Sequence, residues 1–197
     1  MVLNDTQITL LSDEALLKPM IAPFSNRLIR KTEAAKVISH GLSSYGYDVK
    51  LASDVKIFHN MLGGIVDPKR FDEKKLLLDL ELLEDEDGSS YVILPPNGYL
   101  LGRTEECFCI PRNIQVIVVG KSTYARSGLL INCTPIEAGF EGYVVIEAAN
   151  GTPSPIRVYV NEGIAQFIFF EGEPCDVSYA DRGGKYQGQT GVQLPVV

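Results

Sequence analysis

Apolar and polar residues alternate over much of the chain, which is the pattern of strands with one buried face. In residues 47–51, Tyr47, Val49 and Leu51 alternate with two charged residues, and the period continues at residues 55–59. Further apolar or alternating runs span residues 91–94, 99–103, 114–119, 129–133, 143–148, 156–160 and 165–170. Proline, glycine and asparagine separate several runs, at residues 95–98, 150–153 and 161–163. Many short strands joined by such turns predict an all-β barrel or jelly roll.

Two other segments carry local signals. Near the N-terminus, Ser12 is a candidate N-cap, Asp13 and Glu14 would lie in the first helical turn, and Pro19 would end a short helix. The acidic run at residues 84–87 is followed by glycine and serine, which predicts an exposed hairpin tip. A metal site on these four carboxylates is the weaker interpretation.

The composition bounds the class of protein. The chain has 197 residues without a linker, and 45% of them are apolar, which predicts one globular domain over residues 1–197. A net charge of -7 argues against a nucleic-acid polymer as partner. No apolar run reaches the roughly 18 residues needed to cross a bilayer, and the N-terminus lacks a signal-peptide pattern. We therefore expect a cytoplasmic protein that contacts neither membrane nor nucleic acid.

Four cysteines, at positions 107, 109, 133 and 175, are interpreted as small buried thiols. Cys107 and Cys109 fall on the same face of a strand, but neither a CxxC pair nor a nearby histidine accompanies them. Zinc-dependent nucleobase deaminases carry a Pro-Cys-x-x-Cys pair, whereas no second cysteine follows Pro174-Cys175 at that spacing. The sequence therefore predicts no zinc.

The run GKSTYARSG at residues 120–128 places cations and hydroxyls in one short loop. The ammonium of Lys121 and the guanidinium of Arg126 are separated by the hydroxyls of Ser122 and Thr123. Such a loop suits a polyphosphate, and a helical turn at its start would add free backbone N–H groups. The run is an incomplete P-loop, because it lacks that motif's first glycine. A capped surface helix without a ligand is the alternative.

Glu147 ends an apolar strand, and a carboxylate in that position requires an explanation. Val145 and Ile146 precede it and two alanines follow, so its surroundings are apolar unless a pocket opens beside it. Burial would raise its pKa toward neutral pH and suit it to general acid–base catalysis. An ion pair with Arg126 inside the core would be a purely structural reason. The residues alone leave both interpretations open.

Several longer segments form an ordered set of motifs along the chain. They are GLSSYGYDV at 41–49, VDPK at 66–69, GKSTYARSG at 120–128, NEGIAQ at 161–166 and DRGGKYQGQ at 181–189. Together they resemble the motifs of the bacterial dCTP deaminase family. The resemblance extends from the N-terminal helix to the glycine-rich tail, and so many long motifs in the right order make chance a poor explanation.

The resemblance implies a fold, a reaction and an assembly. The family is similar in fold to the trimeric dUTP diphosphatases, with a distorted β-barrel or jelly roll and active sites between the subunits of a homotrimer. Its members convert dCTP to dUTP and ammonia without zinc, with Mg²⁺ carried by the nucleotide, and so feed dUMP and dTTP synthesis. The implied ligands are dCTP, dUTP and, as an inhibitor, dTTP. Residues 181–197 are expected to form a lid over the triphosphate.

By the same resemblance, Glu147 is the general acid/base, Ser122 orients the attacking water and Arg126 stabilises the tetrahedral intermediate. The other expected substrate contacts are Lys121, Thr123, Tyr124, Ala125, Glu137, Val145, Ile146, Gln166, Tyr179, Lys185 and Gln189. The chain departs from the family at Phe140, where many relatives have Trp, and at Ala148-Ala149, where a bulkier pair is usual. Both departures would enlarge the space near the site.

Two other functions stay open on the sequence. One is a bifunctional enzyme that also hydrolyses dUTP to dUMP and diphosphate, because Glu137 stands where diphosphatases and bifunctional relatives use an Asp to activate water. A Glu there would displace the water by about one methylene, which favours deamination alone. The other is a nucleotide-binding regulatory protein without catalysis, which would have no need for Glu147, Ser122 and Arg126 together.

Overall fold

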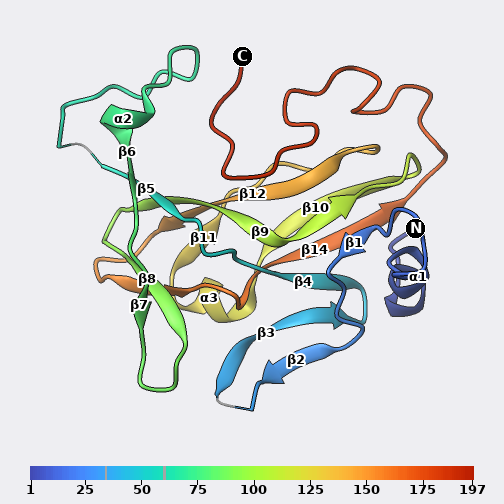
Figure 1. Ribbon diagram of the computed structural model, residues 1–197, viewed down its shortest axis with the longest axis horizontal. Coiled ribbons are helices and arrows are strands. Elements are labelled where there is room, and N and C mark those ends of the chain that lie inside the picture. Colours follow the sequence, from blue (N-terminus) through green and yellow to red (C-terminus); the bar gives the residue numbers. More distant parts are fainter. Residues whose placement is uncertain (34, 60) are drawn as a thin grey trace.

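The computed structural model describes residues 1–33, 35–59 and 61–197, which form a mostly β fold with short helices (Figure 1). The helices are α1 (Asp5–Leu11), α2 (Glu73–Leu76) and α3 (Ser122–Arg126). The strands are β1 (Ile21–Ala22), β2 (Leu28–Lys31), β3 (Lys36–Ser43), β4 (Gly46–Lys50), β5 (Lys56–Phe58), β6 (Leu77–Asp79), β7 (Leu83–Glu84), β8 (Ser90–Leu94), β9 (Tyr99–Cys109), β10 (Ile114–Gly120), β11 (Leu129–Ile131), β12 (Glu141–Asn150), β13 (Ile156–Tyr159) and β14 (Gly163–Glu171). Within the described ranges, no helix is long and apolar enough to cross a membrane.

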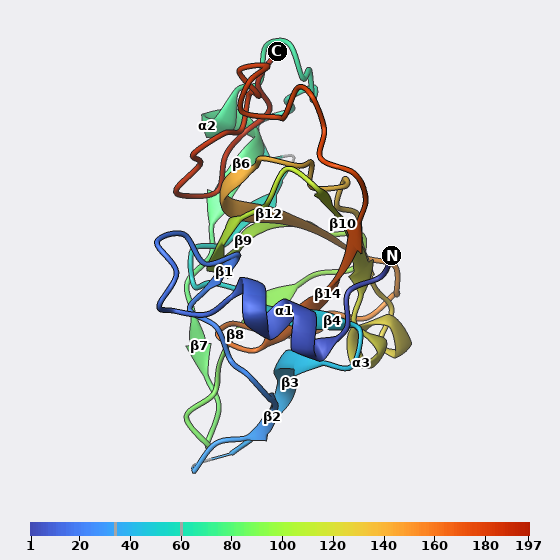
Figure 2. The ribbon, with the colours of Figure 1, turned by 90° about the vertical axis from the view of Figure 1, so that its right-hand side faces the viewer.

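Two antiparallel sheets enclose the main hydrophobic core. In the first, β11, β12, β9, β5 and β6 are neighbours in that order and β1 adds to β9; in the second the order is β10, β14, β4, β3 and β2. Figure 2 shows β12 and β9 on one side of the molecule and β4 and β3 on the other. Phe108 on β9 contacts Phe167 on β14, with ring centroids 5.0 Å apart. A bridge between Leu51 and Thr104 joins the sheets, so the predicted all-β fold is confirmed as a distorted barrel.

The third sheet, β13-β8-β7, confirms the hairpin predicted at the acidic run. Glu84 pairs with Ser90 across the turn, and Gly88 adopts a φ of 81° there. Asp85 binds Arg157, with 2.5 Å between the carboxylate oxygen and the guanidinium nitrogen. In the part of the chain that the structure describes, no cluster of His, Cys, Asp and Glu side chains is arranged to hold a metal ion.

The N-terminal helix exists but lies earlier than predicted. It spans Asp5–Leu11, and Ser12, the predicted N-cap, is its C-cap. The reason is a capping box at Asn4: its side chain accepts from Gln7 N at 3.0 Å, and the Gln7 side chain accepts from Asn4 N at 3.0 Å. Ile8 is fully buried and anchors the helix on the core. The acidic residues after Ser12 therefore follow the helix instead of opening it.

The predicted runs all contain strands, but the β2–β3 hairpin was not predicted. Its residues mix basic, apolar and small side chains, so no clean alternation marks them. Gly41 lies within β3 with a φ of 99°, and a Cβ there would come 2.3 Å from the carbonyl oxygen of Arg27. A glycine is therefore required for the hairpin to close against the preceding loop.

β9 bulges opposite β12, and a buried carboxylate fills the bulge. The ladder between these strands shifts register near its middle, leaving residues 104–106 of β9 outside it. Thr104 Oγ1 repairs part of the gap by accepting from Val144 N at 3.0 Å. Glu106 is fully buried, and its carboxylate accepts from Lys50 N on β4 at 3.0 Å. The carboxylate thus ties the two large sheets together.

β12 separates the core from the outer face of its sheet, because its side chains alternate along its whole length. The buried positions are Gly142, Val144, Ile146, Ala148 and Asn150. The half-exposed positions between them, including Glu147, lie on the opposite face. A single strand therefore contributes both to the core and to whatever occupies the outer face.

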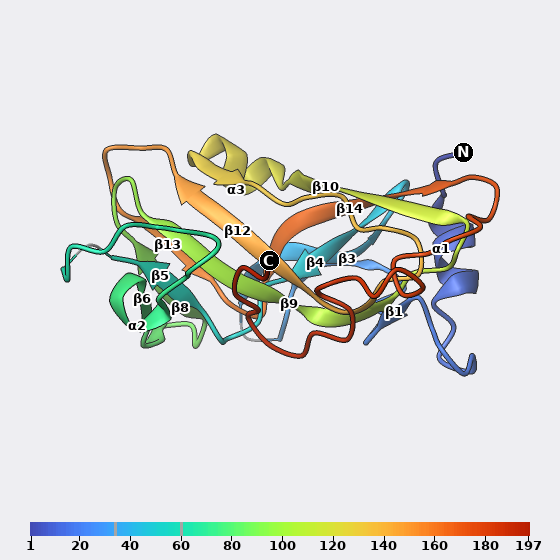
Figure 3. The ribbon, with the colours of Figure 1, turned by 90° about the horizontal axis from the view of Figure 1, so that it is seen from above.

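The C-terminal tail folds back over that outer face (Figure 3). Gln189 forms a parallel bridge with Gly142 on β12, and Gly188 N donates to Glu141 O at 2.7 Å. A Cβ on Gly142 would lie 2.9 Å from the Gln189 carbonyl oxygen, so a glycine is needed for this close approach. Further along, Val192 and Leu194 pack on a second apolar cluster built mainly from β9, α2 and β6. The glycine-rich tail is therefore a docked strap in this structure.

Glu106→Gln should make the stability less dependent on pH. Burial raises the pKa of Glu106 from 4.5 to about 7, so the folded state binds this proton more tightly than the unfolded state. The stabilisation is complete below pH 4.5 and is lost as the pH rises through about 7, with a maximum of about 3 kcal/mol. Glutamine can still accept from Lys50 N, so the Tm of the variant should match wild type near pH 4 and exceed it at pH 8. A Tm difference that is the same at both pH values would contradict this.

Candidate active site

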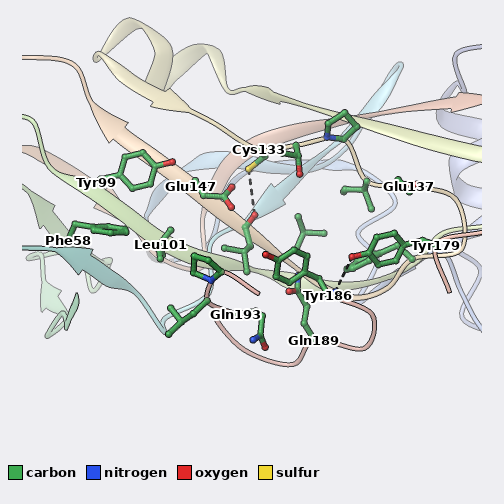
Figure 4. Close-up of a pocket in the computed structure, with 18 residues that line it drawn as sticks. Phe58, Tyr99, Leu101, Cys133, Glu137, Glu147, Tyr179, Tyr186, Gln189 and Gln193 are labelled. Atoms are coloured by element: carbon green, nitrogen blue, oxygen red, sulfur yellow. Dashed lines mark hydrogen bonds between the residues drawn. The ribbon is translucent and has the colours of Figure 1, made fainter. Parts of the chain in front are cut away.

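A cavity of about 510 Å³ opens on the outer face of β12, between that strand, the segment after β11 and the tail (Figure 4). Its lining residues are Phe58, Tyr99, Leu101, Cys133, Thr134, Pro135, Ile136, Glu137, Phe140, Val144, Val145, Glu147, Tyr179, Tyr186, Gln189, Gln193, Leu194 and Pro195. None of these described residues is Lys or Arg. The cavity is therefore largely aromatic and apolar. Its polar groups are carboxyl, amide, hydroxyl and thiol groups, and its described lining contains no cation.

Glu147 is the carboxylate at the floor of this cavity. It pairs with Leu101 of β9, which fixes its backbone in the middle of the sheet. Its Oε2 atom is buried and has no hydrogen-bond partner among the described residues. Burial is the main cause that raises the pKa of Glu147 above its usual range. A carboxyl group in this state can exchange protons near neutral pH.

Aromatic rings line two sides of the cavity. On one side, Phe58 meets Tyr99 edge to face with ring centroids 5.6 Å apart, and the Tyr99 hydroxyl accepts from Asn132 Nδ2 at 3.2 Å. On the other side, Phe140 packs against Tyr179 at 5.9 Å. Such walls suit a flat, weakly polar ring.

The tail closes the remaining side with amide and tyrosine groups. Gln189 Nε2 donates to Tyr143 O at 2.5 Å, while its Oε1 atom is buried without a partner among the described residues. Tyr186 N donates to the Tyr179 hydroxyl at 3.0 Å, which holds both rings at the cavity. Gln189 and Glu147 both line this cavity and each has a buried oxygen without a partner among the described residues, and such groups indicate a ligand that would satisfy them.

Several of the predicted site residues do meet here, but Ile146 does not. The ones that line the cavity are Glu137, Val145, Glu147, Tyr179 and Gln189. Ile146 is fully buried in the core, so its side chain does not line the cavity. The reason is the period of two, since the neighbours of Glu147 on a strand point to the opposite face. For the same reason Ala148 belongs to the core, and of the two departures from the family only Phe140 lines the cavity.

The cationic loop lies outside the cavity. Its expected helical turn is confirmed as α3, on which Ser122, Thr123, Ala125 and Arg126 are exposed to solvent. Arg126 Nη1 donates to Ser122 O at 3.3 Å. Among the described residues, Glu147 takes part in no ion pair, so the alternative of a core pair between Arg126 and Glu147 is wrong. One chain therefore does not bring its three expected catalytic residues together.

Two other members of the loop are structural in this chain. Lys121 is buried, and its ammonium forms an ion pair with the buried Asp48 of β4. Tyr124 is also buried, and its hydroxyl accepts from Tyr159 N at 2.8 Å. Neither side chain lines the Glu147 cavity.

The last two expected contacts come from other parts of the fold. Gln166 on β14 donates through Nε2 to Ser43 Oγ at 3.3 Å, on the second sheet and away from the cavity lining. Lys185 lies on the tail and is exposed. Both residues stay candidates for a site that needs groups from outside the cavity.

The sequence interpretation missed Phe58, Tyr99 and Cys133 at the cavity. Phe58 and Tyr99 are aromatic positions in predicted strands, and nothing in an alternating pattern distinguishes a pocket face from a solvent face. Cys133 was interpreted only as a small buried thiol, and it is a half-buried free thiol next to Glu147. Tyr186 was present in a recognised motif but was given no role.

The comparisons with known proteins agree on one family. The dCTP deaminase-like family profile matches residues 10–172. A dCTP deaminase of Laribacter hongkongensis is 51% identical over 177 residues, covering 89% of this chain and 90% of that protein. A dCTP deaminase of Coxiella burnetii is 52% identical over 178 residues, with 90% of each chain covered.

A solved structure agrees in fold. The crystal structure of 2'-deoxycytidine 5'-triphosphate deaminase from Agrobacterium tumefaciens superposes with a TM-score of 0.57 at 15% identity. The match covers 87% of this chain and 46% of that chain, so this chain spans less than half of that protein. With the family profile and relatives above 50% identity, the conclusion is plain: the chain belongs to the dCTP deaminase-like family.

The ion pair of Lys121 gives a test of its structural role. Lys121→Met leaves the Asp48 carboxylate unpaired in the core and should lower the free energy of unfolding by roughly 3 to 5 kcal/mol. The double variant Lys121→Met/Asp48→Leu removes both charges and should regain most of that loss. Denaturant unfolding at fixed protein concentration measures both. An unchanged stability of Lys121→Met would mean that the pair contributes nothing to the fold.

Proposed function

We propose that this protein catalyses the hydrolytic deamination of dCTP to dUTP and ammonia. The observation that carries the proposal is the half-buried Glu147 carboxylate, which lines an aromatic cavity and has an oxygen without a partner among the described residues. The relatives of 51% and 52% identity are named dCTP deaminase and supply the substrate. The aromatic walls suit a pyrimidine ring, and the amide groups of the tail suit its polar edge.

Glu147 can move every proton that this reaction requires. The ionised carboxylate takes a proton from water as the water oxygen bonds to C4 of cytosine, and it passes that proton to N3. It then takes the proton of the new C4 hydroxyl and gives it to the amino group, which leaves as ammonia while the C4 carbonyl forms. One water is consumed, one ammonia is released, and Glu147 returns to its starting state.

The raised pKa of Glu147 supports this role. A carboxylate with an ordinary pKa would take a proton from water poorly, whereas burial brings the pKa of Glu147 closer to the working pH. β12 and β9 hold the group on paired backbone, so little reorganisation is needed between the two proton transfers.

The triphosphate needs cations that the described cavity residues do not supply. Arg126 and Ser122 are exposed on α3, where a second subunit can meet them. In the proposed homotrimer, α3 of one subunit therefore completes the cavity of its neighbour, with Arg126 stabilising the charge that develops on the intermediate. Mg²⁺ enters with the nucleotide, bound by phosphate oxygens, and offsets further charge.

The tail acts as a lid in this proposal. Gln189 and Tyr186 already line the cavity, and Lys185 lies one residue from Tyr186 on the exposed side. Closure of such a segment excludes bulk water and keeps the intermediate from losing protons to solvent. The feedback inhibitor would be dTTP, which presents the same triphosphate and a similar ring.

Hydrolysis of dUTP to dUMP and diphosphate is the alternative activity. Glu137 would have to activate water for it, and Glu137 does line the cavity. Its carboxylate is held by an ion pair with Arg182 of the tail, which leaves it poorly placed as a base. The pair therefore favours release of dUTP as the final product.

The deciding experiment incubates the purified protein with dCTP and Mg²⁺, separates dCTP, dUTP and dUMP by chromatography, and assays ammonia. Accumulating dUTP with an equal amount of ammonia is the expected result. Formation of dUMP without a build-up of dUTP would assign the bifunctional reaction instead. Tight dCTP binding without any product would assign a regulatory binding protein.

Glu147→Gln should abolish turnover while dCTP binding stays measurable. The amide keeps the size of the side chain but can neither take nor deliver the protons, so the rate should fall by about a thousandfold or more. Glu141→Gln is the matched control, because Glu141 lies on the same strand but pairs with Lys18 outside the cavity. Near-normal turnover in Glu147→Gln would remove this residue from the mechanism.

Mixed trimers test whether the site is shared between subunits. Glu147→Gln and Arg126→Ala subunits are each expected to be inactive as pure preparations. After equal amounts are dissociated and reassembled together, each mixed trimer contains one site with both residues intact, which gives about a quarter of wild-type activity. If one subunit supplied both residues to its own site, reassembly would restore nothing.

A further inference from the structure

The titratable groups that line the Glu147 cavity are Tyr99, Cys133, Glu137, Tyr179 and Tyr186. The partners of the other four groups lie away from β12, whereas the Cys133 thiol bonds to Val145 O on β12 itself. Tyr99 accepts from Asn132, Tyr179 from the backbone of the tail and Tyr186 from Val196 N, while Glu137 pairs with Arg182. Two further charged groups lie along the same sheet, Arg103 stacked on Tyr143 and Glu141 paired with Lys18. Among these titratable groups, Cys133 is therefore the one held against the strand that carries Glu147.

The chain path brings Cys133 against Glu147. The segment after β11 is fixed to β12 where Asn132 N donates to Glu147 O at 2.9 Å. On the next residue, the Cys133 thiol points to Val145 O, with 3.6 Å between sulfur and oxygen. Figure 4 shows the Glu147 carboxylate beside the same sulfur, and Cys133 is among the groups that influence the pKa of Glu147.

The thiol has two acceptors within reach and one proton to give. In the structure that proton is directed at Val145 O, and Glu147 Oε2 has no partner among the described residues. Rotation about the Cβ–Sγ bond would turn this proton from Val145 O toward the neighbouring Glu147 carboxylate. A carbonyl is the better acceptor while Glu147 is neutral, and an ionised carboxylate is the better acceptor once its proton has left.

We propose that Cys133 is a positioning residue whose thiol proton turns from Val145 O to the Glu147 carboxylate whenever Glu147 is ionised. The thiol acts only as a donor, because its burial beside a carboxylate raises the pKa of Cys133 and keeps it protonated. The hydrogen bond from the thiol stabilises ionised Glu147. When the thiol turns back to Val145 O, this stabilisation is lost and neutral Glu147 is favoured. The effect on turnover rests on the proposed deaminase function, whereas the rotation itself does not.

Substitutions at Cys133 test the effect on the reaction through the pH profile of kcat/KM. Cys133→Val removes the donor at nearly constant volume, so the acid limb should move up by about half a pH unit to one pH unit. Cys133→Ser keeps a donor, and its acid limb should lie at or below that of wild type. Cys107→Val is the matched control on β9, outside the cavity lining, and should not move the limb.

The acid limbs of the three variants distinguish the outcomes that support the proposal from those that overturn it. An acid limb that shifts in the valine variant and not in the serine variant supports the proposal. Valine and serine variants with the same limb as each other would overturn it, as would an equal shift in Cys107→Val. Should Cys133→Val fail to fold, Cys133→Ala removes the same donor without adding a branched side chain.

A spectroscopic measurement tests the rotation without any substrate. The Raman S–H band of Cys133 is isolated as the difference between wild type and Cys133→Val. It should move to lower frequency as the pH rises through the titration of Glu147, and it should stay fixed in Glu147→Gln. A band that ignores pH would falsify the proposal whether or not the protein deaminates dCTP. A moving band in a protein that forms no product would overturn only the proposed function.

Discussion

The pairing of β12 with β9 is the constraint on which the rest of the structure depends. These strands form the central ladder of the first sheet, and the alternation of β12 assigns Ile146 to the core and Glu147 to the outer face. A slip of one residue would exchange the two, burying a carboxylate in the barrel and exposing isoleucine. The bulge at residues 104–106 shifts the register between the two halves of the ladder, and the Thr104 hydroxyl accepts a hydrogen bond from Val144 N there. The position of the site is therefore a consequence of register.

Two carboxylates on these neighbouring strands, Glu106 and Glu147, are both desolvated but have different surroundings. Desolvation raises the pKa of both Glu106 and Glu147. Glu106 accepts from Lys50 N in the other sheet and has become part of the core. Glu147 instead lines a cavity, with the Cys133 thiol beside it. Both carboxylates have one oxygen without a partner among the described residues, which is unfavourable, but Glu106 is enclosed in the core whereas Glu147 lines a cavity where a ligand can complete it.

The sequence predicted the parts of this arrangement that depend on local pattern. Alternation identified the core strands, and an isolated acid in an apolar strand marked Glu147 as a candidate without deciding its role. The helix near the N-terminus was predicted too late in the chain. The capping box at Asn4 determines where the helix begins, and the acidic residues after Ser12 do not. Lys121 was predicted to bind the nucleotide. Its actual partner, Asp48, lies 73 residues away, and only the tertiary fold brings the two together. The roles of Tyr99 and Cys133 likewise depend on which segments meet, and no spacing in one chain encodes that.

Electrostatics supports the proposal that the site is shared between subunits. The described residues that line the cavity include Glu137 and Glu147 but no basic side chain, and the chain carries a net charge of -7. A triphosphate brought to that surface alone would meet like charge at short range. The guanidinium that could oppose this, Arg126, is displayed on an exposed helix where it stabilises nothing in its own core. In the proposed homotrimer, the Glu147 cavity of one copy and α3 of the next would complement each other, so assembly and catalysis would share one contact.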